Sequence, residues 1–221
     1  KTGTTLLLRM CLAFENAFID YRKGFNGHEL SIEDFVKKSD YGKEIVISKR
    51  LPPCLLSSVN DEELFDRQAT LIKENNIGII NVIRDGRDTI VSDGNYVKPR
   101  RWIDSMKQRE TYSEVINYEV RYEDLVDIEK TDLIQEDLMA EFGLKKSFNF
   151  SDYPNYVPDW IYNWNVSVTG RAGNQLSDYS KRPLSNSSVG KGLKTYREAC
   201  EPEIIEEFHE QLKFLEYFGE V

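Results

Sequence analysis

The chain has 221 residues, of which 40 % are hydrophobic and 30 % are charged. This composition excludes a disordered, collagen-like or disulfide-scaffold protein. The net charge of −9, from 29 basic and 38 acidic side chains, argues against a protein that follows a nucleic-acid backbone.

The first part of the chain is expected to alternate between helices and strands. Apolar residues at helical spacing predict a helix over residues 4–22, and a capping pattern predicts a short helix over 31–38. A β-branched run predicts a buried strand over 44–48. A helix is expected over 61–75, and the clearest strand covers 78–83.

The rest of the chain continues this alternation. Its expected elements are a helical stretch up to Ser92, helices over 99–111, 133–142 and 203–218, and a strand over 115–122 that leads into a helical turn at Glu123. Residues 148–190 show little periodicity. Apolar strands that alternate with helices indicate an α/β fold, with a parallel sheet flanked by helices on both faces. Because no linker rich in proline, glycine or serine divides the sequence, residues 1–221 are predicted to form a single domain.

The chain begins with Lys1-Thr2-Gly3-Thr4-Thr5, which opens directly into the first predicted helix. A glycine lets successive backbone N–H groups point at one spot, while the lysine and the threonines add a positive charge and hydroxyl donors. These features are typical of a cradle for a phosphate or sulfate group. The pattern also fits a helix that is simply capped by threonine. A nucleotide kinase would show GxxxxGK(S/T), and here the lysine precedes the glycine.

A second motif follows the clearest predicted strand. Arg84 stands at the carboxyl end of that strand, where open parallel sheets bind ligands, and Ser92 follows eight residues later. A loop between the two would let both side chains converge on one phosphate. The same residues also fit a salt-bridged turn, in which Arg84 and Arg87 pair with Asp85 and Asp88.

A third motif covers residues 182–194, with the sequence RPLSNSSVGKGLK. Small hydroxylic residues, glycines and two lysines are typical of a mobile loop that binds anions. A flexible surface linker is the alternative interpretation of this composition.

The order of these motifs resembles that of the sulfotransferase family that uses 3′-phosphoadenosine 5′-phosphosulfate (PAPS). Residues 1–5 are similar to the family's 5′-phosphosulfate loop, PK(S/T)GTT, and Arg84 and Ser92 match its 3′-phosphate motif in type and spacing. Residues 121–125 (RYEDL) are similar to a segment near the adenine, (R/F)YEDL. Residues 182–194 are similar to RP(I/L)SxSSVGxWK, the loop that closes over the nucleotide. The resemblance runs in the family's order over nearly the whole chain.

The resemblance implies a three-layer sandwich, similar to that of P-loop NTPases, with a central, mostly parallel sheet between helices. It also implies a first strand upstream of residue 1. The donor would be PAPS, which leaves 3′-phosphoadenosine 5′-phosphate (PAP), and no metal is expected. The nucleotide would be bound by Lys1, Thr2, Gly3, Thr4, Thr5, Arg84, Ser92, Tyr122, Ser188, Gly190 and Lys191.

The sequence departs from the family where the chemistry is expected. Arg50 stands where cytosolic members have a catalytic histidine, and an arginine that is always protonated is a poor general base. Glycan and tyrosine sulfotransferases use a glutamate after the first helix instead, so Glu29 is the expected base and His28 the second choice. Lys1 and Lys49 are expected to stabilise charge during the transfer.

The family's aromatic residue after GTT is Leu6 in this chain, and Gly192-Leu193 stand where a tryptophan is usual. The acceptor is expected to be a small molecule or a glycan. Aromatic residues between 153 and 179 would either stack on it or pack in the core.

Nucleic-acid and membrane partners are not expected, because the charge is negative and no apolar run reaches the ~18 residues of a membrane span. The three cysteines lack CxxC spacing, which predicts reduced thiols and a cytoplasmic location. A location in the Golgi lumen would require an upstream anchor. Two other functions stay open: a P-loop small-molecule kinase and a nucleotide-binding module without catalytic activity.

Overall fold

The computed structural model describes residues 3–19, 36, 45–47, 62–91, 98–157, 184–185, 187 and 189–217. Helices and strands alternate along these residues, so the chain is broadly α/β as predicted. Strands β1 (Ala17–Ile19) and β2 (Ile45–Ile47) form one parallel pair. Strands β3 (Ile80–Ile83) and β4 (Tyr118–Arg121) form a second parallel pair. The strands predicted over 44–48, 78–83 and 115–122 are therefore confirmed, each over part of its predicted range.

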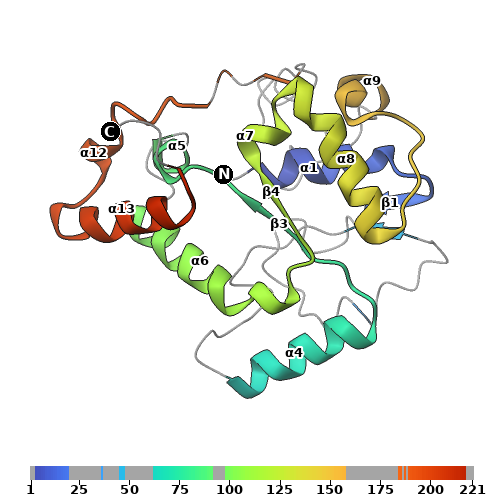
Figure 1. Cartoon of the computed structure of the whole chain (residues 1–221), viewed down its shortest axis with the longest axis horizontal. Coiled ribbons are helices and arrows are strands. Elements are labelled where there is room, and N and C mark those ends of the chain that lie inside the picture. The colour runs from blue at the N-terminus through green and yellow to red at the C-terminus, as the bar shows by residue number, and fades with distance from the viewer. Residues whose placement is uncertain are drawn as a thin grey trace, which may run out of the picture.

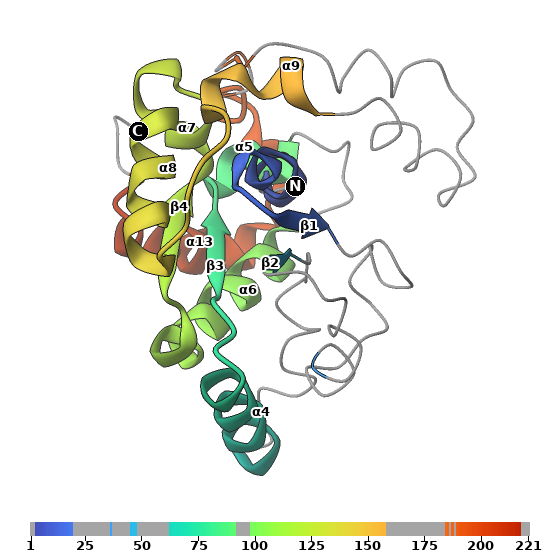
Figure 2. The same cartoon turned by 90° about the vertical axis from the view of Figure 1, so that its right-hand side faces the viewer.

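The pair of β3 and β4 places successive side chains on opposite faces, as a pleated strand must. Val82 lies opposite Val120 and packs in the cluster that contains α1 (Thr4–Met10) and α8 (Ile128–Phe142). The next residue, Ile83, packs in a different cluster, with α5 (Gly86–Val91), α6 (Pro99–Thr111) and α13 (Ile205–Phe214). Figures 1 and 2 show β3 and β4 between these two groups of helices. Helices thus cover both faces of this pair.

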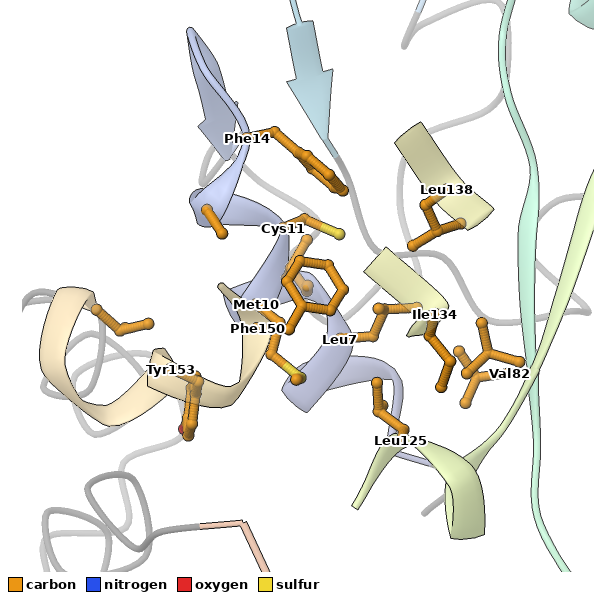
Figure 3. Packing of buried hydrophobic residues seen from close by; sticks show 14 residues of the cluster. Leu7, Met10, Cys11, Phe14, Val82, Leu125, Ile134, Leu138, Phe150 and Tyr153 are labelled. Carbon is orange, nitrogen blue, oxygen red and sulfur yellow. The ribbon is translucent and has the colours of Figure 1, made fainter. Parts of the chain in front are cut away.

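The larger hydrophobic cluster joins the first helix of the chain to the segment after α8 (Figure 3). Met10, Leu138 and Phe150 are each 0 % exposed. The ring of Phe150, in the 3₁₀ turn η3 (Phe150–Asp152), meets the ring of Phe14 edge-on at 5.4 Å between centroids. The short helix α9 (Tyr153–Tyr156) follows, and the Tyr156 hydroxyl donates to the Met10 carbonyl at 3.1 Å.

The helix predicted over 4–22 is wrong in its second half. Helix α1 ends at Met10, and after the 3₁₀ turn η1 (Cys11–Ala13) the backbone becomes extended at Phe14. There Phe14 forms an antiparallel bridge with Lys146, and Asn16 adopts a left-handed conformation with φ of 59°. A helix cannot continue through such a residue. The apolar residues that follow form β1, so pairing with β2 overrode the helical pattern.

The other helix boundaries follow from capping. Helix α6 has the predicted bounds, starting at Pro99, and α4 (Glu62–Glu74) lies within the predicted 61–75. Helix α8 begins before the predicted residue 133, because the Asp127 carboxylate accepts from the Glu129 N–H at 3.0 Å. It ends at Phe142 and is capped by Gly143, whose φ is +64°.

Near the C-terminus the helix predicted over 203–218 is divided. The 3₁₀ turn η4 (Pro202–Ile204) precedes α13, which ends at Phe214. The other short elements are η2 (Ser113–Val115), α7 (Tyr122–Leu125), which is the predicted turn, and α12 (Tyr196–Ala199), which was not predicted.

The predicted helix over 31–38 lies outside the described residues except Val36, which is helical. Within the part of the chain that is described, no helix combines the length and apolar character needed to cross a membrane.

Candidate functional site

Arg84 of the second motif and the RYEDL segment lie together at the carboxyl ends of β3 and β4. Arg84 follows β3 and Tyr122 follows β4. The two strands are parallel, with Ile83 opposite Arg121, so their carboxyl ends lie side by side. This edge is where open parallel sheets bind ligands.

The first motif reaches the same place through Gly3. A Cβ atom on Gly3 would lie 2.3 Å from Cδ2 of Tyr122, so the backbone of Gly3 lies directly against that ring. The φ of Gly3 is +88°, a conformation that side chains disfavour. On the same tyrosine, the Arg84 guanidinium carbon lies 4.3 Å from the ring centroid. Gly3, Arg84 and Tyr122, from three separate motifs, therefore form one contiguous cluster.

Arg84 is only 4 % exposed. Its planar guanidinium carries five N–H donors that match the oxygen geometry of a phosphate. Contact with the Tyr122 ring restricts the conformational freedom of this guanidinium. A cation that is already ordered loses less conformational entropy when it binds an anion.

The third motif is fastened to α5. The Asp88 carboxylate accepts from the Gly190 N–H at 2.6 Å and from the Gly192 N–H at 2.7 Å. A Cβ atom on Gly192 would lie 2.0 Å from the Arg87 carbonyl oxygen, so only glycine fits at this contact. At the other end of the motif, Leu184 packs against the cluster that contains α1. The structure thus bonds this part of the third motif to α5 through Gly190 and Gly192.

The acidic residues around Arg84 have partners of their own. Asp85 forms a buried ion pair with Arg87 at 2.7 Å, and Arg87 also donates to the Tyr217 carbonyl at 2.5 Å. Burial alone would lower the pKa of Arg87, but the hydrogen bond and charge of Asp85 outweigh burial and raise that pKa. The salt-bridged turn was therefore correct for Asp85 and Arg87. Asp88 instead accepts from residues 190 and 192 of the third motif, and we call residues 190–192 the glycine loop.

The C-terminal residues 215–217 contact the end of β4 and the segment that follows it. The Glu123 carboxylate accepts from the Asp85 N–H and from the Tyr217 hydroxyl, each at 3.0 Å. Burial and then the Glu123 charge raise the pKa of Tyr217. The Arg121 guanidinium donates to the Leu215 carbonyl at 2.8 Å and lies 4.8 Å from the Tyr217 ring centroid. No local pattern in the sequence points to Tyr217, because its partners lie far away along the chain.

Of the predicted site residues, the structure brings together Gly3, Arg84 and Tyr122. Gly190 is bonded to Asp88 of α5, the helix that starts two residues after Arg84. Thr4 is half-buried at the start of α1, and the Thr5 backbone lies in the same helix. Lys191 is exposed between Gly190 and Gly192. The predicted residues that lie outside the described part of the chain are Lys1, Thr2, His28, Glu29, Lys49, Ser92 and Ser188.

Two aromatic residues of the stretch 153–179 pack in or against the core, one of the two roles expected for them. Tyr153 is 3 % exposed, and the Tyr156 ring stacks on Phe148 at 5.2 Å between centroids. The other aromatic residues of that stretch lie outside the described residues. Cys11 and Cys200 are free thiols, and burial raises the pKa of Cys11 to about 12, which makes it unreactive.

Comparisons with models of protein families, with curated protein sequences and with solved structures found no match to this chain. The chemistry of the site therefore has to be inferred from its geometry and from the motifs themselves. The buried guanidinium of Arg84 is the group in this cluster whose chemistry suits a phosphorylated ligand.

Proposed function

We propose that this protein is a sulfotransferase that moves a sulfuryl group from PAPS to a hydroxyl or amine of an acceptor. The acceptor would be a small alcohol or a glycan. The observation that carries the proposal is the convergence of four motifs from distant parts of the sequence. Gly3 and Arg84 each contact Tyr122 of the RYEDL segment, and Asp88 holds Gly190 and Gly192 of the third motif.

This convergence supports the proposal because PAPS carries a 3′-phosphate and a 5′-phosphosulfate, and separate motifs would bind each of them. Arg84, Ser92 and Lys191 would bind the 3′-phosphate, with Ser188 and Gly190 in the same loop. The 5′-phosphosulfate would be held by Lys1, Thr2, Gly3, Thr4 and Thr5. Gly3 and Arg84 each lie against the Tyr122 ring, which agrees with its expected place beside the adenine.

In the proposed reaction the acceptor oxygen or nitrogen forms a bond to sulfur as the bond from sulfur to the bridging phosphate oxygen breaks. PAP leaves, and the acceptor proton passes to a base, for which we propose Glu29 and, as the second choice, His28. Lys1 and Lys49 would stabilise the charge on the bridging and sulfuryl oxygens. The protein's contribution is mainly positioning and charge stabilisation, as in phosphoryl transfer.

The proposed fold is a three-layer sandwich like that of P-loop NTPases. Helices on both faces of β3 and β4 support it, since such a sheet needs cover on each side. In this proposal the two parallel pairs are parts of one central sheet. We also propose a cytoplasmic location, which agrees with the free thiols Cys11 and Cys200.

The assignment of Arg84 can be tested with two nucleotides that differ only in the 3′-phosphate. Replacing Arg84 by alanine removes a charged hydrogen bond worth about 1.5–3 kcal/mol, so PAP affinity should fall roughly ten- to a hundredfold. Affinity for adenosine 5′-phosphate, which lacks the 3′-phosphate, should change little. Both affinities are measured by calorimetry on protein whose fold is checked by circular dichroism.

Arg101, which is exposed on α6, offers the matched control. The Arg101→Ala variant loses the same charge and should bind both nucleotides like the unmodified protein. Equal losses for both nucleotides in Arg84→Ala would place Arg84 in the fold rather than at the 3′-phosphate. Unchanged PAP affinity would refute its assignment.

A further inference from the structure

Asp88 makes an unusual set of contacts for an acidic residue beside a proposed anion site. It is 2 % exposed on α5, and its two carboxylate oxygens accept separately from the N–H groups of Gly190 and Gly192. These donors lie 102 and 104 residues further along the chain. A buried carboxylate is unfavourable unless such donors bind it. Breaking this contact would leave a buried negative charge without donors, which would destabilise the fold here.

The glycine loop is shaped to reach this carboxylate. Gly190 has a φ of +77°, and a Cβ atom on Gly192 would lie 2.0 Å from the Arg87 carbonyl oxygen. Beyond the loop, the N–H of Tyr196 donates to the Gly192 carbonyl at 2.9 Å, and Tyr196 itself is 3 % exposed in the core. The loop is thus anchored at its glycines by Asp88 and at its end by Tyr196.

Lys191 lies between the two anchored glycines and is itself exposed. The backbone N–H groups of Gly190 and Gly192, on either side of Lys191, donate to Asp88. These N–H groups therefore point at the protein rather than at a ligand. What the loop can offer a ligand here is the Lys191 side chain. Arg84 immediately precedes the turn that starts α5, so the same helix fixes the place of both cations.

We propose that Asp88 is a positioning residue, which holds Gly190 and Gly192 so that Lys191 meets the same 3′-phosphate as Arg84. This inference rests on the proposed function for the identity of the ligand. Asp88 does not contact the nucleotide in this proposal. Its own negative charge opposes anion binding, and its benefit comes only through the loop.

The sign of the effect separates positioning from simple electrostatics. The Asp88→Asn variant removes a negative charge near a phosphate, so an electrostatic role alone predicts tighter binding of PAP. It also leaves one N–H of the loop facing an amide NH₂ group in place of an acceptor oxygen. Positioning therefore predicts weaker binding, by about tenfold, measured by calorimetry with PAP.

A double-mutant cycle tests whether Asp88 acts through Lys191. In the unmodified protein, Lys191→Ala should lower PAP affinity about tenfold. In the Asp88→Asn background the same replacement should cost less than about twofold, because the lysine is no longer held in place. Losses that simply add, or tighter binding by Asp88→Asn, would overturn the role of Asp88.

Two further variants complete the test, and the fold of each variant is checked by circular dichroism. Gly192→Ala displaces the loop from the Arg87 carbonyl while the Asp88 carboxylate stays, and it should remove the Lys191 contribution in the same way. Asp104→Asn removes one charge from the exposed face of α6 and should bind PAP normally. If the unmodified protein fails to bind PAP, the proposed function fails; if it binds PAP but the losses add, only the inference on Asp88 fails.

Discussion

The contact between Gly3 and Tyr122 can be tested by adding a single methyl group. In the Gly3→Ala variant the new Cβ would lie 2.3 Å from Cδ2 and 3.0 Å from Cε2 of Tyr122. Carbon atoms in contact normally stay about 3.5–4.0 Å apart, so the ring or the start of α1 has to move by about 1 Å. The ring cannot turn away freely, because Arg84 lies on it at 4.3 Å from the centroid.

Two costs add in this variant. An alanine at a φ of +88° is strained by about 1–2 kcal/mol. Forcing a methyl group into a filled contact costs about 1–3 kcal/mol. The free energy of unfolding should therefore fall by about 2–5 kcal/mol, a large part of the 5–15 kcal/mol typical of a domain.

Gly143 provides the matched control for the strain alone. Its φ is +64°, and among the described residues nothing lies within 4 Å of an added Cβ. Gly143→Ala should therefore cost only about 1–2 kcal/mol in urea denaturation. Replacing Tyr122 by alanine together with Gly3→Ala should remove the part of the loss that comes from the clash. Equal losses for Gly3→Ala and Gly143→Ala would refute the proximity of Gly3 to Tyr122, and with it the convergence of the motifs.

Three further predictions concern stability. Burial alone would raise the pKa of Glu119, but hydrogen bonds from Arg109 and Asn81 outweigh burial and lower that pKa. The contribution of Glu119 to the free energy of unfolding is therefore present above its unfolded pKa of about 4.3, and it is lost as the pH falls through the folded pKa. Unfolding free energies measured from roughly pH 6 to pH 3 should fall less steeply in Glu119→Gln than in the unmodified protein, and parallel curves would contradict the pairing. Leu138 is 0 % exposed, so Leu138→Ala should lower the unfolding free energy by about 2–5 kcal/mol, and a loss well under 1 kcal/mol would show that the site is not core. A Cβ on Gly86 would lie 2.7 Å from Cε2 of Trp102, so Gly86→Ala should cost about 1–3 kcal/mol in urea denaturation, and a neutral result would mean that α5 does not pack on that indole.

Local patterns in the sequence predict those helices and strands whose residues favour one conformation strongly. The apolar runs at 44–48 and 78–83 form strands, and Pro99 marks the start of α6. Strand β1 could not be predicted this way, because Ala17 and its apolar neighbours suit a helical stripe and a strand equally well. The choice depends on β2, which lies further along the chain, and on the left-handed Asn16.

The same limit applies to the candidate site. The sequence predicts Arg84 and Tyr122 because each follows a strand within a recognisable motif. It does not predict the role of Asp88, since a charged turn favours a nearby arginine as its partner. The structure instead gives that carboxylate two backbone donors from the glycine loop, and Arg87 pairs with Asp85. Long-range backbone contacts of this kind leave no periodicity or spacing in the sequence.

The central claim is that the carboxyl ends of β3 and β4 hold an adenine nucleotide that carries a 3′-phosphate. It is tested most directly by titrating the unmodified protein with PAP, with ATP plus Mg²⁺ as the parallel sample, by calorimetry and by the shift in Tm. A ligand that binds only the folded state must raise Tm. We predict saturable binding of PAP with a raised Tm and a much smaller response to ATP plus Mg²⁺. A response to ATP plus Mg²⁺ alone would contradict the account and favour kinase chemistry.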